Sequence, residues 1–216
     1  MKIFNKLNIN PTNVNLYYTA FTHTSYSNEN PSCASYERLE FLGDAVIELI
    51  ISDYLYKERH LEEGIMTKMR ATYVCEAALA TYAKDLKFDD DIKLGSGETE
   101  ANNAILSDVF EAFMGALYLD KGLDFTKTIV LDIILKYIDK EIDFLQDYKS
   151  KLQELVQTDK KSVSYEIISE KGPSHKKTFT CQVKVDDIIM GTGVGSSKKL
   201  AEQEAAKEAL SKQAKN

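Results

Sequence analysis

The sequence is poor in the residues on which several classes of protein depend. Its 216 residues include three cysteines, three histidines and no tryptophan. Cys33, Cys75 and Cys181 are odd in number and lack the spacing of metal ligands. They argue against a disulfide framework and against a thiolate metal site. We therefore expect reduced, mostly buried thiols and a cytoplasmic protein.

Long apolar runs are also missing. Residues 1–15 are polar and contain no apolar stretch of signal-peptide length. Runs such as Ala45-Val46-Ile47 are far too short to cross a membrane, so we expect no membrane partner. The apolar fraction of 44% is ordinary for a globular protein, and the length fits one large or two small domains.

The net charge of −7 hides a difference between two parts of the chain. Residues 148–216 hold 13 lysines against nine acidic residues, whereas residues 1–147 hold 14 basic and 25 acidic residues. An acidic first part and a basic second part suggest metal ions in one and a polyanion on the other.

Two acidic stretches stand out in the first part. In one, four carboxylates fall within an arc of roughly 80° on a helix that advances about 100° per residue: Glu37, Glu40, Asp44 and Glu48. The other stretch, residues 104–119, holds Asp108 and Glu111 as its only charged residues. These two are three positions apart and therefore share one face.

An acidic stripe alone usually marks a solvated helix face. Such a face normally mixes lysine, glutamine and serine with its acids, and neither stripe does so. Buried carboxylates repel each other and are costly to desolvate unless something positive lies between them. The pattern therefore favours a pair of divalent metal ions, and hydrolysis of a phosphodiester is the chemistry we expect of them.

Apolar periodicity predicts that the first part is helical. Helices are expected over 39–57, 65–85, 103–119 and 126–145. A helix stop is expected at Glu63-Gly64, where the glycine can take the left-handed C-cap conformation. A polar loop at 95–100 precedes the second acidic stretch, and no strong strand signal occurs in this half.

The second part has a different pattern. A short helix at 149–157 is followed by alternating segments at 163–168, 179–185 and 188–194, with turns at 172–175 and 186–187. Ser196 or Ser197 can cap a last helix that runs to about Leu210, with Leu200 and Ala205 among its inward residues. The predicted order is α-β-β-β-α, joined to the first part by a short linker at 146–148.

These motifs resemble those of a known family. Residues 37–46, ERLEFLGDAV, are similar to the signature of the ribonuclease III family. Residues 22–26, 63–64 and 108–120 resemble further motifs of that family in the same order, and the tail resembles a double-stranded-RNA-binding domain. The resemblance implies a multidomain protein. It has an all-α ribonuclease III endonuclease domain at 1–146 and an α+β (α-β-β-β-α) RNA-binding domain at 147–216.

The resemblance also implies roles for individual residues. The metal-binding carboxylates are expected to be Glu40, Asp44, Asp108 and Glu111, with Mg²⁺ as the cofactor and Mn²⁺ as a substitute. The residues expected to be catalytic are Asp44, Glu111, Glu37 and Glu63. Glu37 and Glu63 are further acidic positions near the cleavage centre, with a role in substrate or subunit contact. The family forms homodimers in which each subunit cuts one strand, and its products carry 5′-phosphates and 3′ overhangs.

The tail is expected to contact RNA through three segments. Binding domains of this kind read the shape of A-form RNA across its minor grooves and phosphates. Gln153 and Glu154 on the first helix and the loop residues Pro173, Ser174 and His175 suit the minor grooves. At the start of the last helix, the positive end of the dipole suits phosphates, and the candidate residues there are Ser197, Lys198 and Lys199.

Residues 98–104 depart from the family pattern. They are shorter than the usual loop and contain no basic residue, which removes the basis for a phosphate contact from this loop and leaves the metal set unaffected.

The favoured function is therefore two-metal hydrolysis of double-stranded RNA, in processing of ribosomal precursors and messages. One alternative is a catalytically inactive duplex-RNA-binding protein on the same scaffold. Another is a di-iron carboxylate protein, which usually needs Glu-x-x-His pairs that neither acidic helix has. Histidine chemistry is disfavoured because His23, His60 and His175 lie in different segments.

Overall fold

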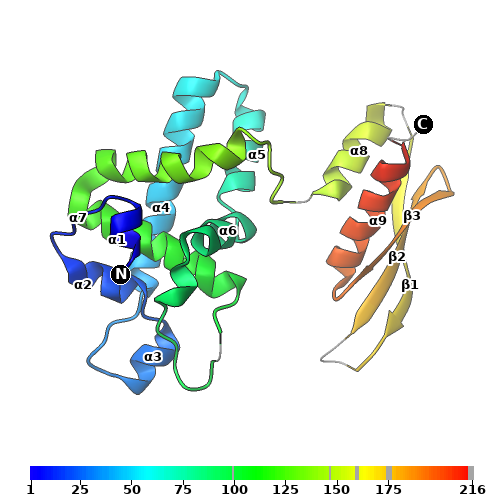
Figure 1. Cartoon of the computed structure of the whole chain (residues 1–216). Helices are drawn as coiled ribbons and strands as arrows, with labels where there is room; N and C mark the ends of the chain where they lie inside the picture. Colours follow the sequence, from blue (N-terminus) through cyan, green and yellow to red (C-terminus); the bar gives the residue numbers. More distant parts are fainter. Residues whose placement is uncertain (99, 146, 159–160, 174–176, 214–216) are drawn as a thin grey trace. The chain divides into compact units, whose positions relative to one another are not determined.

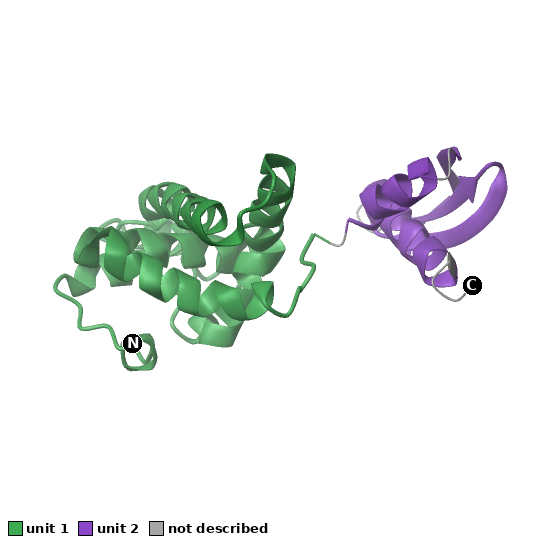
Figure 2. Ribbon diagram, turned by 90° about the horizontal axis from the view of Figure 1, so that it is seen from above, with its two compact units in different colours: residues 1–145 green, residues 146–216 purple. Residues whose placement is uncertain are grey.

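The computed structural model describes residues 1–98, 100–145, 147–158, 161–173 and 177–213. The chain divides into two compact units, Met1–Leu145 and Gln146–Asn216 (Figure 2). Each unit has its own cluster of buried apolar side chains. No helix in the described part of the chain is both long enough and apolar enough to cross a membrane.

The first unit is built from helices (Figure 1). Within its described residues the only strand-like pairing is an isolated bridge between Thr22 and Lys93. The helices are α1 (Ile3–Lys6), α2 (Val14–Ala20), α3 (Thr24–Glu29), α4 (Glu37–Tyr54), the π-helix η1 (Leu55–Arg59), α5 (Glu63–Tyr73), α6 (Glu76–Leu86), the 3₁₀ helix η2 (Phe88–Asp90) and α7 (Asn103–Ile138).

The core of this unit lies where α4 and α7 pack together, which is the most extensive contact between its elements. The N-terminal half of α7 is buried on nearly every side, as expected for a stretch with two charged residues. The helix is broken at Gly122, whose φ of 79° and ψ of 176° are not helical. α6 also packs against α7 and contributes buried side chains to this core.

Three predicted helix boundaries were wrong. The stretch 65–85 forms two helices, because Cys75 adopts an extended conformation between α5 and α6. The last predicted helix ends at Ile138 rather than at residue 145. Gly64 is not a C-cap: it lies inside α5, and the left-handed residue in this region is His60, with a φ of 47°.

The second unit is a three-stranded antiparallel sheet with two helices. Its elements are α8 (Tyr148–Thr158), β1 (Val163–Lys171), β2 (Thr178–Val185), β3 (Ile188–Gly195) and α9 (Lys198–Gln213). The strand order is β1-β2-β3, and Val163 pairs with Val185 at one end of the β1–β2 ladder. Figure 1 shows α8 and α9 on the same side of the sheet. The predicted order α-β-β-β-α is confirmed.

Glycines in β3 allow α9 to pack closely on the sheet. A Cβ atom on Gly191 would lie 2.3 Å from the carbonyl oxygen of Ala205, and one on Gly193 would lie 2.1 Å from the Ala205 nitrogen. The predicted turn is also present, since Asp186 and Asp187 have φ values of 47° and 65°. The prediction for Leu200 was wrong, because this side chain is 51% exposed.

Candidate functional site

Two glycines set the distance between α4 and α7. A Cβ atom on Gly43 would lie 1.8 Å from the carbonyl oxygen of Glu111, and one on Gly115 would lie 2.3 Å from the carbonyl oxygen of Leu39. Neither position can carry a side chain without displacing backbone. The two helices therefore touch backbone to backbone, which brings the acidic side chains on the neighbouring turns close together.

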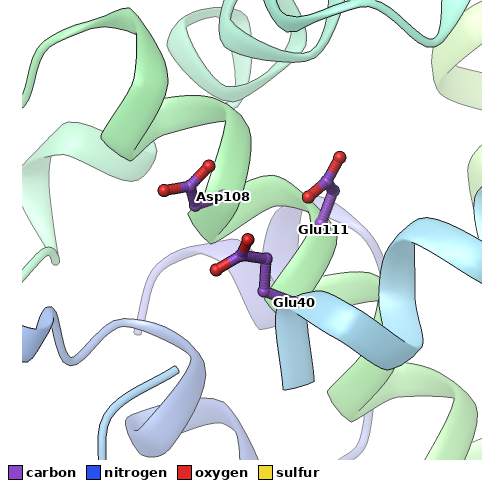
Figure 3. A group of neighbouring side chains, drawn as sticks. All are labelled: Glu40, Asp108 and Glu111. Carbon is purple, nitrogen blue, oxygen red and sulfur yellow. The ribbon is translucent and has the colours of Figure 1, made fainter. Parts of the chain in front are cut away.

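Three carboxylates converge beside this contact (Figure 3). Glu40 projects from α4, and Asp108 and Glu111 project from α7. One carboxylate oxygen of each residue lies within 4.8 Å of the other two, and all three residues are partly buried. Among the residues that the structure describes, this is the one group of three or more such side chains that could hold a metal ion.

The electrostatics of Glu111 are those of a carboxylate that lacks a counter-charge. Its pKa is raised to about 8, first because it is buried and then because four other carboxylates repel its charge. These neighbours are, in order of effect, Asp44, Glu40, Asp108 and Glu48.

The other two members of the cluster are perturbed in the same direction. Burial raises the pKa of Glu40, and the charges of Asp108, Glu37 and Asp44 raise it further. Burial also raises the pKa of Asp108, against the opposing effect of a hydrogen bond from Tyr36. A cation placed among these groups would offset the cost of burial that raises all three pKa values, and the repulsion that adds to it for Glu40 and Glu111.

The donor set fits a hard divalent cation. Mg²⁺ and Mn²⁺ prefer carboxylate oxygens and water, and Mg²⁺ retains several waters when it binds to protein. The cluster offers carboxylate oxygens from three residues, and no thiolate or imidazole belongs to it. The residues present are therefore suited to the metal that the sequence predicts.

The remaining carboxylates of the α4 stripe lie at the edge of the cluster. Asp44 and Glu37 are exposed, and neither belongs to the group whose oxygens lie within 4.8 Å of one another. Asp44 is nevertheless close enough to raise the pKa of Glu111. Glu37 accepts a hydrogen bond from the Ser35 hydroxyl at 3.1 Å.

Glu63 does not lie with the cluster in this chain. It is the first residue of α5, where its carboxylate accepts a hydrogen bond from the Thr67 hydroxyl at 3.0 Å. It lines a cavity together with Ser52. Ser52 lies roughly 18 Å from Glu40 along α4, at about 1.5 Å per residue.

Sequence reasoning missed the role of Tyr36. Its hydroxyl donates a hydrogen bond to Asp108 Oδ2 at 3.0 Å. Behind it, the His23 ring lies 5.6 Å from the Tyr36 ring, centroid to centroid, and His23 Nδ1 lies 3.1 Å from Glu98 Oε2. The available signal was a tyrosine directly before the acidic stretch that begins at Glu37, because a tyrosine hydroxyl that becomes buried needs a hydrogen-bond partner.

The residues predicted to contact RNA lie on three segments of the second unit. Gln153 is half-buried and Glu154 is exposed on α8, and Pro173 is exposed after β1. Ser174 and His175 lie outside the described residues.

At the start of α9, the Ser197 hydroxyl accepts a hydrogen bond from the Leu200 backbone N–H at 3.2 Å. Of the two serines predicted as possible caps, Ser197 is therefore the one that caps the helix. Lys198 and Lys199 are both exposed in the first turn. Their ammonium groups lie at the positive end of the helix dipole, where an anion is favoured.

Comparisons with known proteins agree with this geometry. The chain matches a family model described as Ribonuclease-III-like over residues 13–138 and a double-stranded RNA binding motif over residues 148–213. The Ribonuclease 3 of Onion yellows phytoplasma is 47% identical over 99% of this chain and 91% of its own length. That of Streptococcus gordonii is 46% identical over 98% of this chain and 95% of its own length.

A solved structure is also similar. It is the nuclease domain of ribonuclease III from Campylobacter jejuni, described as structurally flexible in a region involved in dimer formation. It is 37% identical to this chain, with a TM-score of 0.58, and the match covers 62% of this chain and 95% of that domain.

Proposed function

The chain belongs to the ribonuclease III family and is an endoribonuclease of double-stranded RNA, and from this premise we propose how its residues divide the work. Residues 1–146 act as the nuclease domain. Residues 147–216 act as the RNA-binding domain and hold the duplex. Ribosomal RNA precursors and messenger RNAs are the proposed substrates. Three free cysteines and an RNA substrate support a cytoplasmic location.

The nuclease domain hydrolyses the phosphodiester by a two-metal mechanism in this proposal. Glu40, Asp44, Asp108 and Glu111 hold the ions, which are Mg²⁺, with Mn²⁺ as a substitute. When bound, the two ions would supply an activated water and a stabilised leaving oxygen. The observation that carries this proposal is the meeting of three partly buried carboxylates from two helices, because such a group is repulsive until a cation joins it.

The remaining acidic positions have supporting roles. Glu37 adds negative charge beside Glu40, whose pKa it raises, and so strengthens the attraction for cations. Glu63 is too far from the cluster in its own chain to hold the same ion. We assign it to contact with substrate or with a second subunit.

The active form is a homodimer in this proposal. Large apolar side chains are exposed along α4 and α7: Phe41 is 83% exposed, Leu49 is 55% exposed and Leu119 is 53% exposed. Leu119 also lines a groove of about 470 Å³, together with Leu16, Leu39 and Leu42 and with polar residues that include Asn13 and Arg38. Exposed apolar surface of this kind is typical of an interface between subunits. Each of two centres would then cut one strand and leave 5′-phosphates and 3′ overhangs.

The proposal is tested with long duplex RNA in a gel assay with Mg²⁺, with Mn²⁺ and with EDTA. The variant Glu111→Gln keeps the shape of the side chain and removes one charge from the cluster. We expect the wild type to produce short duplexes, and EDTA or Glu111→Gln to stop cleavage while RNA binding remains. Glu76→Gln, an exposed residue in the first turn of α6, is the matched control and is expected to cut normally.

The RNA-binding residues are tested in the same assay. Replacing Lys198 and Lys199 by alanine should weaken binding and reduce the slope of log affinity against log salt by about 2. Lys212→Ala, at the other end of α9, is the control, since Lys212 already pairs with Glu208 at 2.7 Å. If the wild type binds duplex RNA and never cuts it with either metal, the protein is an inactive binding protein and the catalytic assignments are wrong.

A further inference from the structure

A tyrosine hydroxyl lies directly behind the carboxylate cluster. Tyr36 is 3% exposed and immediately precedes α4. Its hydroxyl donates to Asp108 Oδ2 at 3.0 Å, and its backbone N–H donates to the carbonyl oxygen of Thr22 at 2.9 Å. Through its backbone and its side chain, Tyr36 therefore connects the start of α4 with the segment before α3 and with the acidic face of α7.

The contacts of Tyr36 fix the position of its ring. The His23 ring packs against it at a centroid distance of 5.6 Å, and His23 Nδ1 contacts the Ser25 hydroxyl at 2.8 Å and Glu98 Oε2 at 3.1 Å. Burial, the contact with the His23 ring and the hydrogen bond to Asp108 hold the phenol in one orientation. Its hydroxyl is thus a preorganised donor toward Asp108.

A hydrogen bond to one oxygen of Asp108 limits the rotation of the carboxylate about its χ2 bond, which is otherwise soft. The other oxygen keeps its lone pairs for a cation. Partners of this kind behind a metal ligand orient the ligand, and their loss typically costs 10- to 100-fold in metal affinity or activity.

We propose that Tyr36 is a positioning residue that holds Asp108 in the orientation in which it binds a divalent cation. This inference rests on the proposed metal function of the cluster. Tyr36 acts through Asp108 and touches neither the ion nor the RNA, so its removal weakens binding of the metal and leaves the chemistry of the loaded site intact.

The chain contains a matched pair for comparison. Tyr17 is also buried, and its hydroxyl donates to Asp120 Oδ2 at 3.0 Å, the same distance as in the Tyr36–Asp108 pair. Neither Tyr17 nor Asp120 belongs to the carboxylate cluster. The change Tyr17→Phe therefore removes an equivalent buried hydrogen bond without touching the proposed metal ligands.

The test compares the full-length wild type, Tyr36→Phe, Tyr17→Phe and Glu111→Gln by direct titration with Mn²⁺. Bound and free Mn²⁺ are distinguished by electron paramagnetic resonance in the absence of RNA. We expect the dissociation constant for Mn²⁺ to be higher in Tyr36→Phe than in the wild type by about 10-fold or more. In Tyr17→Phe this constant should stay at the wild-type value. Cleavage by Tyr36→Phe should recover at saturating Mn²⁺, and both tyrosine variants should unfold at similar temperatures without metal.

Several results would overturn the inference. One is unchanged Mn²⁺ binding by Tyr36→Phe while the wild type binds and Glu111→Gln does not. Another is that Tyr36→Phe and Tyr17→Phe weaken Mn²⁺ binding equally, which would mean a general loss of structure. If the wild type itself binds no Mn²⁺, the proposed metal function fails, and this outcome is distinct from the failure of Tyr36 alone.

Discussion

Asp120 and Glu111 are two carboxylates of α7 that are wholly or partly buried and whose surroundings differ. The Asp120 side chain is 1% exposed and accepts hydrogen bonds from the backbone N–H groups of Thr12 and Asn13 and from the Tyr17 hydroxyl. Burial alone would raise the pKa of Asp120, but these donors lower it overall. For Glu111, burial and then the charges of its acidic neighbours raise the pKa to about 8.

The lowered pKa of Asp120 predicts a contribution to stability that depends on pH. The carboxylate stabilises the fold above its unfolded-state pKa, near 3.8, and this contribution is lost as the pH falls through the lower pKa of the folded state. Asp120→Asn should therefore destabilise the protein by about 2 kcal/mol at pH 7. The difference from the wild type should shrink as the pH is lowered from 5 toward 3, measured by urea unfolding at each pH.

Asp124→Asn is the control for this series, because Asp124 is exposed on the same helix. Its effect should be small at every pH. A constant difference between the wild type and Asp120→Asn over the whole range would show that the charge of Asp120 does not stabilise the fold.

The sequence predicted the residues of the cluster better than it predicted their supporting contacts. Glu40, Asp108 and Glu111 could be identified because helical phase places each of them on an acidic face of an otherwise mostly apolar helix. The hydrogen bond from Tyr36 joins residues 72 positions apart, and no local pattern encodes such a contact. The same limit applies to Glu63, since a motif gives its identity and not its distance from the cluster.

At the level of elements, we expect the addition of one methyl group at Gly43 to disturb the packing of α4 against α7. Gly43→Ala places a Cβ atom 1.8 Å from the carbonyl oxygen of Glu111, so α4 and α7 must separate. We expect a loss of about 1–3 kcal/mol in the free energy of unfolding, measured with urea, together with weaker binding of Mn²⁺.

The matched variant is Gly64→Ala in α5, where an added Cβ atom meets nothing within 4 Å. It should stabilise the protein by about 0.5 kcal/mol, because alanine loses less conformational freedom than glycine in a helix. If Gly43→Ala were as stable as Gly64→Ala, the close contact between α4 and α7 would not be required.

The elements that the sequence predicted well are those with a long regular pattern. The apolar periodicity of α4, α7 and α8 and the alternation of the three strands are strong signals. The break at Cys75 has no glycine or proline to mark it. The helices α1, α2 and α3 were not predicted because each has seven residues or fewer and so shows at most two turns of a pattern.

The proposed homodimer can be tested at the level of the whole molecule. Phe41 is the most exposed of the large apolar side chains that the structure describes, at 83%. In a two-fold dimer Phe41→Lys removes this side chain twice, which should cost about 3 kcal/mol or more. We expect the dimer dissociation constant to rise by at least about 100-fold in analytical ultracentrifugation.

Leu155→Lys is the control, because Leu155 is 44% exposed on α8 in the second unit. It should leave sedimentation unchanged. A wild-type protein that sediments as a monomer at all concentrations would contradict the dimer, and an unaffected Phe41→Lys dimer would place the interface elsewhere.

The pairing of Tyr36 with Asp108 also has a consequence for biosynthesis. The two residues are 72 positions apart, and a ribosome that adds roughly 5 to 20 residues per second needs about 4 to 14 s to travel between them. Until α7 is made, the side of α4 that packs against α7 in the folded protein lacks this partner. The carboxylate cluster is therefore completed only when α7 is made, and under the proposed function a polypeptide still in synthesis cannot cut RNA before α7 has left the ribosome.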